Sequence, residues 1–130
     1  MQRDQIPYLK HPDGELQTLK LLCEAMTSRR QRLRNGLLLL EIDRFIVQHG
    51  KWYNGRWGAD AASRHLHSYV NTFWNARRTT TIALSELSED GFVCTVSYGL
   101  STSRQPPLFV WLNVERLEEI GIKIGWITAR

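Results

Sequence analysis

The sequence has few cysteines, and the two that it has stand far apart. Cys23 and Cys94 show neither the C-x-x-C spacing of a zinc or redox motif nor the density of a disulfide-stabilised secreted domain. No apolar run approaches the roughly 18 residues that cross a bilayer, and the N-terminal stretch lacks the apolar segment of a signal peptide. These absences predict a cytoplasmic protein with two reduced thiols in its core and no membrane partner.

Motifs of catalysis and of metal binding are also missing. The chain contains no G-x-S-x-G, no P-loop and no paired-carboxylate motif. His65 and His67 are two positions apart, so on a helix they point in nearly opposite directions and do not chelate one ion. We therefore expect no cofactor, no metal and no catalytic residues. The remaining enzymatic hypothesis is a metal-free ribonuclease-like toxin that uses His67, Arg64, Arg78 or Arg104 around a phosphate.

The length and composition are those of one globular domain. The 130 residues are 42% hydrophobic and 23% charged, which is close to the average for folded proteins. A chain of this length closes one sizeable core, and no linker divides it. The sequence predicts a single domain over residues 1–130.

The hydrophobic pattern changes from a helical period to a strand period along the chain. Apolar residues recur every three to four positions in the first part and alternate in the last part. The prediction is an α+β fold in which N-terminal helices pack on a C-terminal antiparallel meander of three or four strands. The predicted helices cover about 15–34, 37–49 and 60–78, with a break at Asn35-Gly36 and a left-handed cap at Gly50. The predicted strands lie at 79–84, 92–98, 108–112 and 122–126, with one helical turn or a loop at 115–120.

Residues 51–58 combine aromatic and basic side chains around an Asn54-Gly55 turn signal, which predicts a small hairpin or loop. Trp52, Tyr53 and Trp57 beside Arg56 suit stacking on unpaired bases. Tryptophans in small domains also commonly close the core. We expect Trp57 to be buried and Tyr53 to be exposed.

Positive charge is concentrated in the middle of the chain. Residues 29–78 hold nine arginines and one lysine against three acids, a net charge of +7, whereas the whole chain carries +4. Thirteen of the seventeen basic residues are arginine, the side chain suited to bidentate phosphate contacts. An arginine-rich genome gives the same bias without a functional reason.

One face of the predicted helix 60–78 carries only polar and basic groups, with Asp60 as the sole acid at its start. Such a face contacts phosphates and base edges without repelling them. Together with the 29–34 arginine cluster and the aromatic hairpin, it predicts a contact surface for nucleic acid or an acidic partner. The candidate contact residues are Arg29, Arg30, Arg32, Arg34, Tyr53, Arg56, Arg64, His67, Ser68, Asn71, Asn75 and Arg78.

The function that follows from the sequence is that of a small Arg-rich nucleic-acid-binding accessory or regulatory protein, with DNA favoured over RNA. The alternative is a protein-interaction module, an inhibitor or adaptor of the kind found in phage and mobile elements, which uses the same arginines against an acidic protein surface. The exposed helix face is also compatible with an ordinary solvated surface that binds nothing.

Overall fold

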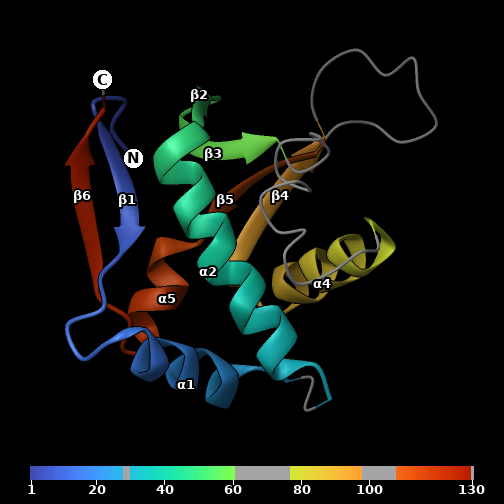
Figure 1. Cartoon of the computed structure of the whole chain (residues 1–130). Coiled ribbons are helices and arrows are strands. Elements are labelled where there is room, and N and C mark those ends of the chain that lie inside the picture. The colour runs from blue at the N-terminus through green and yellow to red at the C-terminus, as the bar shows by residue number, and fades with distance from the viewer. Residues whose placement is uncertain (28–29, 61–76, 98–107, 130) are drawn as a thin grey trace.

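The computed structural model describes residues 1–27, 30–60, 77–97 and 108–129 (Figure 1). The first half of the chain forms strand β1 (Gln5–Leu9), helices α1 (Glu15–Ala25) and α2 (Arg32–His49), and strands β2 (Lys51–Tyr53) and β3 (Arg56–Asp60). The second half forms helix α4 (Arg77–Glu89), strands β4 (Val93–Ser97) and β5 (Leu108–Leu112), helix α5 (Val114–Glu119) and strand β6 (Ile124–Thr128). The predicted α+β class is confirmed.

The strands form two antiparallel sheets that mix the two halves of the chain. One sheet has the order β2-β3-β5-β4, and the other pairs the first strand, β1, with the last, β6. Figure 1 shows β1 and β6 side by side at one flank, with α2 crossing in front of the larger sheet. The strands are therefore not confined to a C-terminal meander, because β1 precedes the helices and β2 and β3 follow α2 in the first half of the chain.

Two turn signals in the first half do not act as turns. Asn35 and Gly36 lie inside α2, whereas the sequence predicted a helix break there. A Cβ on Gly36 would lie 2.5 Å from Leu19 Cδ1, so the glycine lets α1 and α2 approach closely. The predicted left-handed cap at Gly50 is also wrong, since Gly50 is extended (φ −70°, ψ 166°) and leads directly into β2.

The middle of the chain departs most from the prediction. Asp60, expected at the start of a helix, is the last residue of β3, and residues 77 and 78 belong to α4, which continues to Glu89. Residues 61–76 of the predicted helix lie outside the described part of the chain. The strand expected at 79–84 is therefore wrong, because this segment is helical. Its threonines favour a strand locally, but Ala83, Leu84 and Leu87 repeat at helical spacing and are buried in the core.

The core lies between the helices and one face of each sheet. Helix α2 contributes more buried side chains to it than any other element, as expected for a helix with a wide apolar face. The helical spacing of Leu66, Tyr69, Val70 and Phe73 predicts that they pack on the segment that forms α2, but these four residues lie outside the described part of the chain. The main core residues are Ile6, Leu9, Leu22, Leu38, Leu39, Ile42, Phe45, Ile46, Ala83, Leu87, Phe92, Val110, Leu112, Leu117 and Ile122.

A partly buried polar network joins α2 to α4. Asn35, which is 0% exposed, donates from Nδ2 to Glu86 Oε2 at 2.8 Å. Arg34 donates from Nη2 to Glu86 Oε1 at 3.0 Å and from Nε to Asn35 Oδ1 at 3.1 Å. The carboxylate of Glu86 therefore satisfies one buried amide and one half-buried guanidinium at once.

Replacing Glu86 with Ala is expected to lower the free energy of unfolding by about 1–3 kcal/mol, because a buried amide donor loses its partner. The matched control is Glu89→Ala, which removes the same charge from an exposed position of α4 and is expected to change stability by less than about 0.5 kcal/mol. Urea denaturation of the two variants measures the difference. Equal losses in the two variants would contradict this role of Glu86.

Candidate nucleic-acid interface

The hairpin predicted at residues 51–58 is present and divides its aromatic residues between two faces. Asn54 (φ 48°) and Gly55 (φ 80°) both have positive φ, the conformation of a tight two-residue hairpin turn. Tyr53 pairs with Arg56 and Trp52 pairs with Trp57. Because side chains alternate along a strand, Tyr53 and Arg56 share one face of the sheet and the two tryptophans share the other.

The tryptophan side of the hairpin packs toward the protein. The indole N–H of Trp57 donates to the Arg3 carbonyl oxygen at 2.9 Å, and the Trp52 and Trp57 rings meet edge to face with centroids 6.0 Å apart. Trp57 also packs against the core. Trp57 and Tyr53 are both half-buried, so they do not divide into one buried and one exposed ring as expected.

The opposite side of the four-stranded sheet carries three neighbouring aromatic rings together with one arginine and one glycine. We call this side the aromatic face and define it by Tyr53, Arg56, Gly58, Phe109 and Trp111. The register places Gly58 and Trp111 on this side, away from the buried Ala59 and Val110. The Tyr53 and Phe109 centroids are 5.2 Å apart, and the Phe109 and Trp111 centroids are 5.9 Å apart. The rings thus extend across β2, β3 and β5.

Gly58 makes this arrangement possible. A Cβ at this position would lie 2.7 Å from Phe109 Cζ and even closer to the Val110 carbonyl oxygen. Only glycine leaves room for the Phe109 ring to lie over β3 and reach Tyr53 on β2. Phe109 is fully buried, and we infer that it supports the half-buried rings of Tyr53 and Trp111 on either side.

Arg56 places a positive charge on the aromatic face. Its side chain is exposed, and Cζ lies 5.9 Å from the centroid of the Trp111 ring, within the range of a cation–π contact. One of its five N–H groups, on Nη1, donates to the Gly55 carbonyl oxygen at 3.1 Å. The guanidinium is therefore held beside the rings while its outer edge faces solvent.

Strand β4 borders the aromatic face with small apolar groups. Cys94 pairs with Trp111, and Val96, which is 37% exposed, pairs with Phe109. Burial raises the pKa of the Cys94 thiol, and the nearby Arg56 acts in the opposite direction. Cys94 and Cys23 are both half-buried free thiols, so they are less deeply buried than the sequence suggested.

The arginine cluster at 29–34 lies at the other end of α2. Arg30 is exposed, Arg32 is half-buried with an Nε that has no hydrogen-bond partner, and Arg34 is held in the ion pair with Glu86. Helix α2 is 18 residues long, which separates this cluster from the hairpin by about 27 Å. The structure therefore does not bring Arg30 and Arg56 into one patch.

The remaining candidate residues are not placed on a surface. Arg29, Arg64, His67, Ser68, Asn71 and Asn75 lie outside the described residues. Arg78 belongs to the first turn of α4, and its side chain is outside the description.

Sequence reasoning missed Gly58, Phe109 and Trp111. The segment Leu108–Leu112 was predicted as a strand, and it pairs on both edges, with β3 and with β4. The available signal was the i, i+2 spacing of Phe109 and Trp111, which puts both rings on one face. Their proximity to the hairpin had no local signal, because it depends on β5 pairing with β3.

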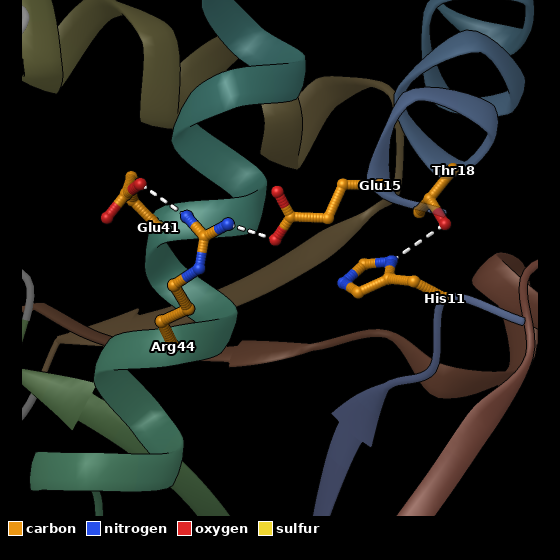
Figure 2. A network of polar contacts seen from close by, with 5 residues as sticks. All are labelled: His11, Glu15, Thr18, Glu41 and Arg44. Carbon is orange, nitrogen blue, oxygen red and sulfur yellow. Dashed lines mark hydrogen bonds and ion pairs between the residues drawn. The ribbon is translucent and has the colours of Figure 1, made fainter. Parts of the chain in front are cut away.

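A second group of polar residues ties the N-terminal segment to the helices (Figure 2). His11 Nδ1 and Thr18 Oγ1 share a hydrogen bond of 2.8 Å. Figure 2 shows the Arg44 guanidinium between Glu41 and Glu15, and it donates to both. Thr18 is buried, and Arg44 already has two carboxylate partners, so we assign this network to the packing of α1 on α2. Within the described residues, no three His, Cys, Asp or Glu side chains are placed to hold a metal ion.

Comparisons with known proteins add no functional assignment. No protein-family model, no curated protein and no solved structure matches this chain. Of the helices in the described ranges, none has the length and apolar character needed to cross a bilayer.

Proposed function

We propose that this chain is a nucleic-acid-binding protein that holds single strands on its aromatic face. The observation that carries the proposal is the contiguous group of Tyr53, Phe109 and Trp111 on one side of a sheet, with Arg56 Cζ 5.9 Å from the centroid of the Trp111 ring. Aromatic side chains bind unpaired bases of any sequence through their flat surfaces, and nearby cations neutralise the phosphates.

The geometry favours a single strand over a duplex. In a duplex the flat surfaces of the bases are covered by their neighbours, so rings on a sheet reach them only where the strand is unpaired. Tyr53 and Trp111 are half-buried, and their rings lie on a sheet instead of on a helix that fits a groove. The sequence favours DNA over RNA, and we therefore propose single-stranded DNA as the ligand. Single-stranded RNA is the ligand to compare with it.

Two of the three charged residues on this side of β2 and β3 favour an anionic ligand, whereas the third, Asp60, pairs with Phe109 and carries the opposite charge. Arg56 and the exposed Lys51 both lie on the aromatic-face side of the hairpin, since Lys51 pairs with Gly58. They belong to the middle segment, which carries most of the positive charge of the chain. Binding that neutralises phosphates weakens steeply with salt, so an affinity that falls as salt rises is expected.

Two single variants, Arg56→Gln and Trp111→Leu, are each expected to bind a 12-nucleotide oligothymidylate more weakly than the wild type does. Loss of one stacking ring costs about 1–3 kcal/mol, roughly a 5- to 150-fold rise in Kd. Fluorescence anisotropy measures Kd at low and high salt for the oligothymidylate, for the matching RNA and for a duplex. Circular dichroism and melting curves check that each variant is folded.

The matched control is Arg30→Gln, which removes the same charge from an exposed position at the far end of α2. Arg30→Gln is expected to raise Kd by less than threefold relative to the wild type. The rise caused by Arg56→Gln is expected to be several times larger than that. If Arg30→Gln has the larger effect, the arginine cluster and not the aromatic face is the contact surface. If the wild type binds neither strand nor duplex at low salt, the proposal is wrong and an acidic protein partner becomes the better hypothesis.

A further inference from the structure

Strand β6 forms an open edge of the two-stranded sheet. In the described residues β6 pairs with β1 alone, and Figure 1 shows it on the outer flank with β1 between it and α2. The hydrogen bonds from Lys10 N to Lys123 O and from Ala129 N to Asp4 O show which residues of β6 bond to β1. Residues 125 and 127 therefore bond to β1, while the main-chain groups of Ile124, Trp126 and Thr128 point outward.

This edge lacks the features that usually prevent strand-to-strand association. Edge strands are commonly protected by charged side chains, by proline or by a bulge. The segment Ile124–Thr128 contains no charged residue and no proline, and its pairing with β1 is regular over all five residues. At its centre the Trp126 side chain is 44% exposed. The edge thus offers main-chain hydrogen-bonding groups beside a large apolar side chain.

We propose that two copies of this chain associate by antiparallel pairing of their β6 strands about a two-fold axis at Trp126. This register places Trp126 opposite Trp126 of the second copy and Ile124 opposite Thr128 of the second copy. Because residues 124, 126 and 128 all point outward, the pairing forms about six main-chain hydrogen bonds. The small two-stranded sheets of the two copies become one four-stranded sheet, which is more stable than an isolated pair of strands.

The position of Lys123 favours the antiparallel direction for a second copy. In the antiparallel register the exposed Lys123 side chains of the two copies lie at opposite ends of the paired strands, about 20 Å apart. That separation exceeds the screening length of about 8–10 Å at physiological salt. A parallel arrangement would put the two lysines side by side. The short edge buries a small area, so we expect a weak, reversible dimer.

Sedimentation equilibrium of the full chain without nucleic acid tests the proposal, and its result is independent of the proposed function. The wild type is expected to show a mass that rises from monomer toward dimer between about 10 and 500 µM. Trp126→Lys and Trp126→Glu are each expected to remain monomeric, because like charges then face each other across the axis. An equimolar mixture of the two variants is expected to dimerise again, because opposite charges then face each other.

The mixture distinguishes this register from other modes of association. A wild type that stays monomeric throughout, or a Trp126→Lys variant that dimerises like the wild type, would overturn the proposal. A mixture that stays monomeric when the wild type dimerises would show that Trp126 does not face itself, and would overturn it too. If Trp126→Lys fails to fold, Thr128→Pro removes an outward N–H instead and is expected to weaken dimerisation at least tenfold; unchanged dimerisation would again overturn the proposal.

Discussion

Replacing Asp43 with Asn is expected to stabilise the protein at pH 8 and to remove much of the loss of stability that occurs as pH rises. The Asp43 carboxylate is 5% exposed and accepts a hydrogen bond from Leu9 N at 2.9 Å. Burial raises the pKa of this carboxyl to about 7, opposed by the Leu9 bond and by Arg44, whereas Glu15 raises it further. The folded protein therefore favours the protonated form of Asp43, although the hydrogen bond from Leu9 N by itself favours the charged form.

The direction of the pH effect follows from the two pKa values. Unfolded, the Asp43 carboxyl has its ordinary pKa of 3.8, and folded it has a pKa of about 7. The stabilising contribution of its protonated form is complete below about pH 4 and is lost as pH rises through 7. The full difference corresponds to on the order of 4 kcal/mol. An Asn at this position keeps an oxygen for Leu9 N and has no charge to bury.

Urea denaturation of the wild type and of Asp43→Asn between pH 4 and pH 8.5 measures this effect. The gap between the two curves is expected to widen in favour of Asn as pH increases. Asp13→Asn serves as the control, because Asp13 is exposed and the same change there is expected to leave the profile of the wild type. A constant gap for Asp43→Asn at every pH would contradict the raised pKa.

Replacing Gly58 with Ala is expected to be the most damaging small substitution in the four-stranded sheet. The added methyl group would collide with the Val110 carbonyl oxygen and with the Phe109 ring. Because the carbonyl belongs to the backbone of the neighbouring strand, β3 and β5 must separate. We expect a loss of about 3 kcal/mol or more, together with weaker oligonucleotide binding because Phe109 no longer supports Tyr53 and Trp111.

Gly121→Ala provides the comparison for this variant. Gly121 has a positive φ of 94°, but a Cβ there meets nothing within 4 Å, so the expected cost is the conformational one of about 1 kcal/mol. Thermal melts of the two variants measure the difference. A Gly58→Ala protein as stable as Gly121→Ala would mean that β3 and β5 do not approach as closely as the structure shows.

The parts of the fold that depend on neighbouring residues were predictable from the sequence. The Asn54-Gly55 turn, the strand Leu108–Leu112 and the buried helix α2 each carry their signal within a short window. The pairing of β1 with β6 and of β3 with β5 does not, because it joins segments far apart in the chain. Helix α4 was missed because a run of threonines favours a strand locally. In the folded protein, the packing of Ala83, Leu84 and Leu87 in the core favours a helix instead.

The candidate site shows the same limit. Tyr53 and Arg56 were identified because aromatic and basic residues surround one turn in the sequence. Phe109 and Trp111 join them only through the order of strands in the sheet. Arg34 resembles its neighbours in the arginine cluster, yet it pairs with Glu86, fifty-two positions away in the sequence. The local composition suggested nucleic acid as the ligand, but the residues that form the aromatic face come together only through the order of the strands in the sheet.

The central claim is tested most directly by following the tryptophan indole N–H signals in an NMR titration with a 12-nucleotide oligothymidylate. Each indole gives one signal, assigned by single Trp→Phe variants. We predict that the Trp111 signal shifts on binding, because a base stacks on the aromatic face, while the Trp126 signal on β6 stays in place. Saturation of binding with the Trp111 signal unchanged would contradict the account.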